Sequence, residues 1–304
     1  MNVSVVIPTF NRKPILIKCL RSLENQKLNS LVKSYEVVVI DDGSTDGTCD
    51  WIKSNKEELS HVVLYEQEHG GPALGRNLGI MKSKNQIIIF IDSDLIVLND
   101  FIIQHVNKLF FAWKKYGKNC FTYGSVINTS NFESPESENY KLTDISFAYF
   151  ATGNVAISRD LLLKIGLFDT TFSLYGWEDL ELGERLKKLG TKLIKCPRAV
   201  GFHWHPPFTY DQLDILIKQE KERAKMALLF YRKHPNLRVK FAIQLTILHK
   251  LIWTLLCLGG LVNIQTLKPI LISLIKRNHN RLALELARIP LNHLYVRELF
   301  KLNK

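Results

Sequence analysis

The sequence is poor in the motifs that mark disulfide-stapled, zinc-binding and P-loop proteins. Its five cysteines are scattered and none stand in a C-x-x-C pair, which argues against a disulfide framework or a zinc site and favours a reducing cytosol. No G-x-x-x-x-G-K-[ST] occurs, and no G-x-G-x-x-G follows the first apolar run. A bound nucleotide would therefore need a metal and a few cationic side chains to neutralise its phosphates.

The N-terminus lacks the basic segment and long apolar run of a secretory signal, because Pro8 interrupts the first apolar stretch. We therefore expect residues 3–7 to form the first strand of a cytoplasmic protein. Hydrophobic content of 46% and aromatic content of 10% are ordinary for a globular chain. The length of 304 residues suits one large domain, or one domain with an appendage.

The net charge of +12 is concentrated in the last third of the chain. Residues 1–205 contain 24 Lys and Arg against 23 Asp and Glu, whereas residues 206–304 contain 17 against 6. Such a basic segment predicts an anionic partner, and charge alone fits both lipid head groups and nucleic acid. Because no nucleic-acid recognition module is visible, we expect no nucleic-acid partner.

Short apolar runs alternate with amphipathic segments through the first half of the chain. The runs lie at 3–7, 36–40, 61–66 and 87–91. This alternation predicts an α/β fold with a mostly parallel sheet that is buried on both faces. In open sheets of this kind, ligands bind beyond the carboxyl ends of the strands.

Carboxylates follow the second and the fourth of these runs, as Asp41-Asp42 and as Asp92-Ser93-Asp94. Two Asp residues separated by one position share a face of an extended chain. Mg²⁺ and Mn²⁺ bind through such carboxylates together with substrate phosphates. Turn formation and helix capping are the alternative roles. We favour a metal and diphosphate site, with Arg76 as the cationic side chain nearest the phosphates.

The segment "YGWEDLELGERLKKLG" predicts a helix that ends at Gly190, because Leu182, Leu186 and Leu189 recur at helical spacing. Glu178 and Asp179 fall in its first turn, where the helix dipole favours ionised carboxylates. That environment suits a general base better than a general acid. Helix capping is the alternative role of the pair.

The character of the sequence changes near residue 210, so we predict a catalytic domain over 1–210 and a helical region over 211–304. The polar residues 128–147 predict a long mobile loop of the kind that often covers a site. Residues 251–267 are uncharged but interrupted by Gly and by polar side chains, which weakens a membrane-spanning interpretation. We favour peripheral docking on an anionic membrane; a helical subdomain, a dimer interface and a true span remain open.

Five segments occur in the order found in family 2 glycosyltransferases with the GT-A fold, which the chain resembles over residues 1–205. They are "VSVVIPTFNR", "VVVIDDGSTDGT", "GGPALGRNLGI", "FIDSD" and "GWEDLELGERLKKLG". The resemblance implies inverting, metal-dependent transfer of a sugar from a nucleotide-diphosphate sugar, with UDP sugars favoured, to a glycan or lipid-linked acceptor. No Arg-Trp pair of a processive Q-x-x-R-W motif occurs, so we expect one sugar to be added per encounter.

The resemblance also implies the residues of the donor site. The nucleotide would contact Pro8, Thr9, Phe10, Asn11, Arg12, Asp41, Asp42, Arg76, Asp92 and Ser93. Asp94 would bind Mn²⁺ or Mg²⁺. One of His203 and His205 would complete the metal shell or contact the diphosphate, with His203 slightly favoured, although a structural histidine is the alternative.

The resemblance places the remaining chemistry at the helix predicted above. Asp179 would be the catalytic base, and Glu178 would orient the acceptor hydroxyl or Asp179. Trp177 would stack on the acceptor sugar, unless it is a core residue.

Two other classes of function stay open at this point. Sugar nucleotidyltransferases share carboxylates at a sheet edge, but they generally begin with a Gly-rich loop that "IPTFNRKP" lacks. An inactive membrane-associated scaffold would be expected to lose its D-x-D or E-D pair, and both are present. We therefore favour an enzyme of cell-surface polysaccharide or glycoconjugate synthesis, peripheral on the cytoplasmic face of a membrane, with a homodimer left open.

Overall fold

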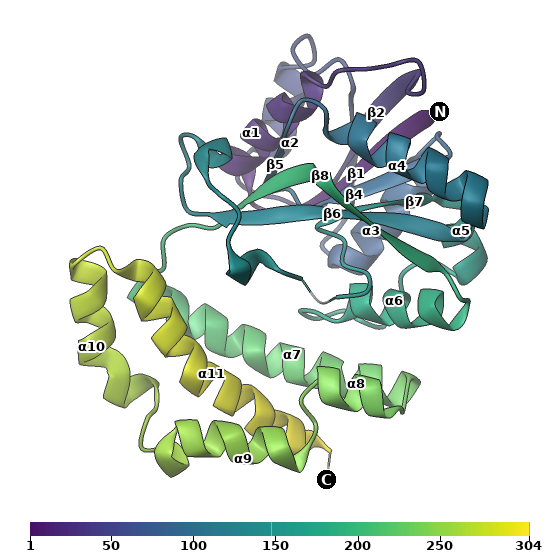
Figure 1. Ribbon diagram of the computed structural model, residues 1–304. Helices are drawn as coiled ribbons and strands as arrows, with labels where there is room; N and C mark the ends of the chain where they lie inside the picture. The colour runs from purple at the N-terminus through teal and green to yellow at the C-terminus, as the bar shows by residue number, and fades with distance from the viewer. Residues whose placement is uncertain (147, 304) are drawn as a thin grey trace. The chain divides into compact units, whose positions relative to one another are not determined.

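The computed structural model describes residues 1–146 and 148–303 (Figure 1). The chain divides into two compact units, one formed by residues 1–173 and 178–205 and the other by residues 174–177 and 206–304. The domain boundary at 210 stays a prediction, because compactness does not show that either unit folds by itself.

The N-terminal unit is built on one eight-stranded sheet with the strand order β3-β2-β1-β4-β7-β6-β8-β5. The strands are β1 (Asn2–Thr9), β2 (Ser34–Asp41), β3 (Val62–Glu66), β4 (Ile87–Ile91), β5 (Leu95–Val97), β6 (Cys120–Thr129), β7 (Asn154–Ser158) and β8 (Lys192–Trp204). The first four strands in this order pair in parallel, whereas β7 runs antiparallel to both β4 and β6. The sheet is therefore mixed, with its parallel half where the sequence predicts it.

Alternating side chains explain why the apolar runs form strands that are buried on both faces. In β1, Val5 and Ile7 pack into one core cluster, while Val6, between them, packs into another. The same alternation occurs in β4, where Ile89 and Phe90 point to opposite clusters. A strand with no polar face has to be covered on both sides.

Helices supply that cover. Those that contribute to the first cluster are α1 (Lys13–Glu24), α2 (Thr48–Ser54) and α4 (Phe101–Tyr116). Those that contribute to the second are α3 (Pro72–Lys82), α5 (Arg159–Ile165) and α6 (Glu178–Lys188). The predicted helix α6 ends at Lys188 and is closed by Gly190, whose φ is 71°, as the sequence indicates, whereas Leu189 is exposed.

The polar segment predicted at 128–147 contains local structure in its described residues, 128–146, while its mobility stays a prediction. Residues 128 and 129 end β6, and two short 3-10 turns follow, η1 (Pro135–Ser137) and η2 (Leu142–Asp144). The buried Asp144 organises the segment by accepting hydrogen bonds from the Asn128 side chain at 2.8 Å and from the Lys141 backbone at 2.8 Å. Residue 147, the last of this predicted loop, lies outside the described residues.

The second unit is helical, as predicted for the C-terminal region. Its elements are η3 (Tyr210–Gln212), α7 (Leu213–Lys233), α8 (Leu237–Ala242), α9 (Ile247–Leu256), η4 (Leu258–Gly260), α10 (Ile264–Lys276) and α11 (Asn280–Leu302). The long helices α7 and α11 lie side by side (Figure 1). Its core includes Leu213, Leu271, Ala287 and Leu291. The fully buried Tyr295 donates its hydroxyl to the Ile243 carbonyl oxygen at 2.8 Å.

Candidate active site

Strand order brings the polar strand ends to one edge of the sheet. Because β1 lies between β2 and β4, the carboxyl ends of these three parallel strands are neighbours. Thr9 is in register with Asp41, and Asp92 directly follows β4. On the other side, β5 pairs with β8 so that Leu95 lies opposite His203. Residues that are far apart in the sequence therefore meet at this edge.

Three of these side chains form a potential metal site. Ligand atoms of Asp92, Asp94 and His203 all lie within 4.8 Å of one another. Two carboxylates and an imidazole are a donor set that suits Mn²⁺, and carboxylates with phosphate oxygens suit Mg²⁺. The geometry adds Asp92 to the predicted ligand pair, whereas the family resemblance implied a place for that carboxylate near the ribose or sugar.

Asp94 is the most heavily engaged of the three. It accepts from Arg12 Nη1 at 2.5 Å through Oδ2 and contacts His203 Nε2 at 2.9 Å through Oδ1. Burial by itself disfavours a charged Asp94, but the hydrogen bond and charge of His203, with the charge of Arg12, hold its pKa below the ordinary value. Arg12 was expected beside the nucleobase, and its guanidinium instead pairs with a predicted metal ligand.

The two histidines of "GFHWHPP" have different surroundings. His203 contacts Asp94, whereas His205 Nε2 lies 3.2 Å from the Asn128 side-chain oxygen. The two rings pack at 4.1 Å. Burial alone would lower the pKa of His203, but the hydrogen bond and charge of Asp94 raise it overall. Geometry thus favours His203 over His205 as the donor-site histidine.

Arg76 forms the centre of a buried ion-pair cluster. Its guanidinium donates to Glu178 Oε1 at 2.8 Å and to Asp92 Oδ1 at 3.3 Å, and its side chain is only 7% exposed. Arg76 was expected near the donor phosphates or sugar, and Glu178 beside the acceptor hydroxyl or Asp179. The ion pair joins these two residues, and both roles stay predictions. Glu178 Oε2 is buried and has no hydrogen-bond partner among the described residues.

Asp179 is in a less favourable electrostatic environment than its place in the first turn of α6 suggests. Burial raises its pKa, the charge of Glu178 raises it further, and the charge of Arg76 partly offsets both. The expectation that Asp179 ionises readily is therefore wrong, because desolvation and the like charge of Glu178 outweigh the helix dipole. A raised pKa still suits a general base, since proton transfer is most efficient when the pKa lies near the working pH.

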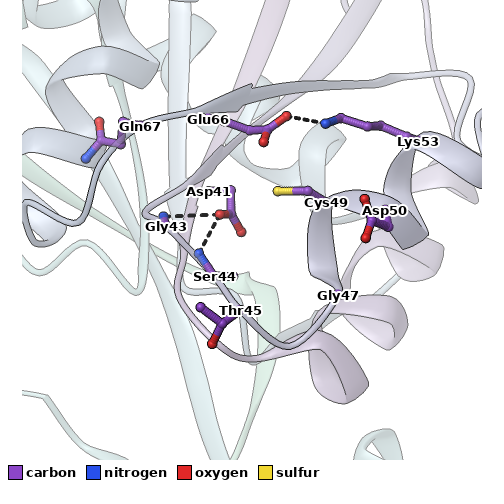
Figure 2. Close-up of a pocket in the computed structure, with 10 residues that line it drawn as sticks. All are labelled: Asp41, Gly43, Ser44, Thr45, Gly47, Cys49, Asp50, Lys53, Glu66 and Gln67. Atoms are coloured by element: carbon purple, nitrogen blue, oxygen red, sulfur yellow. Dashed lines mark hydrogen bonds and ion pairs between the residues drawn. The ribbon is translucent and has the colours of Figure 1, made fainter.

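A pocket of about 350 Å³ lies beside Asp41 (Figure 2). Asp41 Oδ1 accepts from the backbone nitrogens of Gly43 and Ser44, at 3.2 and 2.8 Å. Its Oδ2 is buried and accepts no N–H or O–H among the described residues. The thiol of Cys49, a weak donor, is a neighbour, and burial and the Asp41 carboxylate raise the pKa of that thiol. Figure 2 also shows the Lys53–Glu66 ion pair on the pocket wall. Asp41 thus keeps an acceptor oxygen for a ligand.

Asp42 differs from its neighbour, because the chain itself uses its carboxylate. Oδ1 accepts from Gln67 Nε2 at 2.6 Å and from the Gly70 nitrogen at 2.9 Å. Oδ2 accepts from the Gly71 nitrogen at 2.9 Å and contacts His69 Nδ1 at 2.9 Å. Asp42 was expected to share in nucleobase binding, and the structure shows it holding the turn before α3.

The remaining predicted donor residues surround the end of β1. Phe10 is 41% exposed and stacks on His69 at 4.2 Å. Asn11 has a left-handed backbone, with φ of 51°, and its side-chain oxygen accepts from the Thr45 nitrogen at 2.8 Å. Two further predicted residues, Thr9 and Ser93, are buried, and Pro8 is partly buried.

Trp177 belongs to the second unit, unlike the rest of the predicted site. Its indole nitrogen donates to the Arg223 carbonyl oxygen at 3.0 Å, and its ring lies 5.9 Å from that of Phe230. These contacts match the alternative of a packing residue. Its φ of 78° is strained for a bulky side chain, and such strain often accompanies functional sites.

Gly153 is a site residue that the sequence alone did not reveal. A Cβ at this position would lie 3.2 Å from Asp92 Oδ2, so a side chain would push against that carboxylate. Next to it, the side-chain oxygen of Asn154 lies 2.7 Å from Nε2 of the fully buried His105, and burial lowers the pKa of His105 to about 4. The available signal was a Gly directly before the buried run "NVAIS".

Comparison with known proteins places this architecture. Residues 4–166 match the family described as "Glycosyl transferase family 2". A chondroitin synthase of Pasteurella multocida (strain Pm70) is 27% identical over 276 residues, which cover 77% of this chain and 28% of that relative. The chain thus spans less than a third of the length of this relative.

Two solved structures show the same fold at low sequence identity. One is the mannosyltransferase PcManGT from Pyrobaculum calidifontis in complex with GDP-Man and Mn²⁺, with a TM-score of 0.56, 18% identity and coverage of 99% of this chain and 86% of that one. The other is S. aureus TarS 1-349 in complex with UDP-GlcNAc, with a TM-score of 0.54, 16% identity and coverage of 100% and 93%. The predicted GT-A class with a C-terminal helical extension is confirmed.

Proposed function

The chain belongs to glycosyl transferase family 2, and on that premise we propose that it transfers one sugar per encounter from a nucleotide-diphosphate sugar to an acceptor hydroxyl, with inversion. One observation carries the proposal. At one edge of the sheet, Asp92 belongs to the potential metal site and also pairs with Arg76, which in turn pairs with Glu178. We favour a UDP sugar. A GT-A neighbour holds UDP-GlcNAc and another holds GDP-Man, so the nucleotide is the first thing to test.

The side chains at the sheet edge fit a divalent cation, Mn²⁺ or Mg²⁺. Asp94, Asp92 and His203 would hold it, because their ligand atoms lie within 4.8 Å of one another. When bound, such an ion supplies Lewis-acid stabilisation of the departing diphosphate. Arg12 would have to release Asp94 Oδ2, at 2.5 Å in the structure, and its partly exposed guanidinium would then be free to neutralise phosphate oxygens.

The nucleotide itself would be recognised beside Asp41. Its buried Oδ2 is a free acceptor, as a base N–H requires. The exposed ring of Phe10 directly follows Thr9, which is in register with Asp41 on the neighbouring strand, and it offers a face for stacking. Asp42 contributes indirectly, because it accepts from the Gln67 side chain and from the backbone of Gly70 and Gly71, which leads into α3.

The acceptor hydroxyl would give its proton to Asp179 as its oxygen attacks the anomeric carbon. Arg76 serves this step in two ways. It anchors Glu178, the residue next to the base, and its charge keeps the pKa of Asp179 lower than burial alone would allow. We therefore assign Arg76 and Glu178 positioning roles and Asp179 the role of base.

The acceptor and the location of the enzyme follow from the same proposal. We infer a glycan or lipid-linked acceptor in cell-surface polysaccharide or glycoconjugate synthesis, and a peripheral site of action on the cytoplasmic face of a membrane. A chondroitin synthase among the relatives supports the polysaccharide assignment. The basic region at 206–304 supports the membrane assignment. A homodimer is the alternative use of that region.

A thermal-shift screen of UDP, GDP, dTDP and CMP sugars, each with and without Mn²⁺, tests the donor site. A ligand at a hundred times its dissociation constant adds about 2.7 kcal/mol to the stability of the folded state, a change that such a screen resolves easily. We expect one nucleotide class to stabilise the protein in a Mn²⁺-dependent way. Asp41→Asn should reduce that effect, while Asp160→Asn, which replaces an exposed carboxylate of α5, should preserve it.

A folded protein that responds to none of these donors would contradict the proposal and favour the inactive scaffold. Transfer to an acceptor is then measured with the donor that binds. Donor binding without any transfer by the wild type, across glycan and lipid-linked acceptors, would contradict the assignment of a transferase but not the donor site.

A further inference from the structure

The helix α9 of the C-terminal unit turns its apolar face outward. None of its ten residues, all within the described part of the chain, is buried. Six large apolar side chains on it are between 42% and 74% exposed: Ile247, Leu248, Leu251, Ile252, Leu255 and Leu256. Leu258 and Leu261 extend the surface past the end of the helix, at 60% and 74% exposed. We call these eight residues the α9 ridge.

The opposite side of α9 carries the groups that attach it to its own unit. The Trp253 indole nitrogen donates to the Gln244 side-chain oxygen at 2.6 Å, and the Lys250 ammonium lies 5.3 Å from the centre of the Phe300 ring. Cys257, which follows the helix, is fully buried. In most surface helices the apolar face packs against the core. In α9 the apolar face is exposed instead.

A membrane-spanning helix does not explain the α9 ridge. Residues 237–256 are the one segment, in the part of the chain that the structure describes, with the length and hydropathy of a span. The segment is broken, however, because α8 ends at Ala242 and Gln244 has a φ of 62°. The ten residues of α9 extend about 15 Å, half of the roughly 30 Å that a span requires.

Charge and the exposed apolar surface together favour one partner for the α9 ridge. From Arg223 to Leu284 the sequence contains no Asp or Glu and eleven Lys and Arg. Lys240 and Lys268 come from α8 and α10, the helices on either side of the ridge in the sequence. A second copy of the chain would bring the same positive charge against this surface and be repelled, whereas anionic lipid head groups would be attracted.

We propose that the α9 ridge lies in the surface of an anionic membrane, with its leucine and isoleucine side chains at the acyl boundary and the flanking lysines among the head groups. Helices with one apolar face and basic flanks bind in this way, parallel to the membrane plane. Lysine side chains suit the position, because their long apolar stems let the ammonium reach the head groups. The inference rests on the membrane location proposed above, but not on the identity of the donor.

Cosedimentation of the purified chain with vesicles tests the α9 ridge. Vesicles of phosphatidylcholine alone are compared with vesicles that also contain phosphatidylserine, at low and high salt. We expect binding only with phosphatidylserine, and weaker binding at high salt, because salt screens the head-group charge. Equal binding to both vesicle types, or none to either, would overturn the proposal.

Matched variants locate the interaction. Leu251→Ser with Leu255→Ser should reduce the partition constant at least tenfold, and the exposed control pair Leu28→Ser with Met81→Ser should not. Near an anionic surface each lysine contributes about fivefold to binding, so Lys240→Gln with Lys268→Gln should weaken binding to the phosphatidylserine vesicles. The charge-matched control, Lys114→Gln with Lys115→Gln in the N-terminal unit, should keep binding.

Two further measurements on the same variants separate the outcomes. The donor-dependent thermal stabilisation should persist in the ridge variant, because no donor residue is changed. A wild type that binds vesicles but no donor would contradict the proposed function and leave the ridge assignment standing. Sedimentation velocity tests whether a second copy of the chain, rather than a membrane, covers the ridge. A wild-type dimer that the ridge variant converts to a monomer, without vesicle binding, would overturn the proposal in favour of self-association.

Discussion

Replacing the proposed base should make the protein more stable, and only above acidic pH. Burial and the charge of Glu178 raise the pKa of Asp179 above its ordinary value of 3.8 in the unfolded chain. The native state therefore keeps a proton that the unfolded state loses, so the free energy of unfolding falls as pH rises from about 4 to the native pKa. Above the native pKa the full penalty is present. Asp179→Asn removes the charge and keeps the side-chain oxygen that accepts from the Leu180 nitrogen at 2.7 Å.

The size of the effect follows from how far the fold raises the pKa of Asp179. A tenfold change in an acid dissociation constant corresponds to about 1.4 kcal/mol. Burial is the largest cause of the raised pKa, but the Asp179 side chain keeps some contact with solvent, and the charge of Arg76 lowers the pKa in part. We therefore expect a gain of about 1–3 kcal/mol at mildly alkaline pH. For a chain of this size that gain raises the melting temperature by about 2–4 °C per kcal/mol. The gain should shrink as pH falls towards 4, where the wild type is protonated in both states.

Thermal unfolding of wild type and Asp179→Asn across acidic to alkaline pH measures this difference. Glu181→Gln is the control on the same turn of α6, because Glu181 accepts from Arg185 Nε and Nη2 at 2.9 and 2.7 Å. Removing that pair should lower stability by about 1–3 kcal/mol at neutral pH. Transfer activity of Asp179→Asn should be abolished while the donor-dependent thermal stabilisation stays.

An Asp179→Asn protein that is less stable than the wild type at alkaline pH would refute the electrostatic account of this residue. A gain of the same size at every pH would refute it too, because it would have to come from packing. Normal turnover in this variant would refute the assignment of Asp179 as the base, whatever its effect on stability.

The contacts of the site support four further predictions. Asp94→Asn should abolish Mn²⁺-dependent donor binding in calorimetry while the fold persists by circular dichroism. Arg76→Met strands two carboxylates that it now pairs, and should cost about 3–5 kcal/mol in urea unfolding at neutral pH, with a smaller loss at acidic pH. Asp42→Ala removes the acceptor of three hydrogen bonds to the segment 67–71 and should cost about 2–4 kcal/mol by the same assay. Gly153→Ala should weaken Mn²⁺ binding several-fold with little loss of stability, because its Cβ would press on Asp92.

Local patterns were sufficient to predict the elements and their approximate place. The runs at 3–7 and 87–91 became β1 and β4, because a strand buried on both faces needs continuous apolar sequence. The antiparallel strand β7 in the middle of the sheet was not predicted. Its run "NVAIS" looks like any other strand, and its direction depends on which neighbours it pairs with.

In the candidate site, too, local patterns predict the residue types, whereas the fold decides which side chains pair. A D-x-D after a buried strand was enough to predict carboxylates at the edge of the sheet, and the E-D pair was enough to predict acidic groups at the start of a helix. Sequence could not distinguish Asp41 from Asp42, since they are adjacent and chemically identical. The structure distinguishes them, because the backbone of residues 70 and 71 satisfies Asp42 and leaves one oxygen of Asp41 unpaired.

By itself the sequence determined the α/β class, the acidic strand ends and the basic, apolar C-terminal third, because these depend on side-chain type and local periodicity. Tertiary structure alone decided that Arg76 pairs with Glu178, that His203 meets Asp94 and that α9 turns its leucines outward. Such contacts join residues separated by about a hundred positions, or depend on which face a neighbouring helix covers. The pKa of Asp179 belongs with them, because burial and a like charge exist only once the chain has folded.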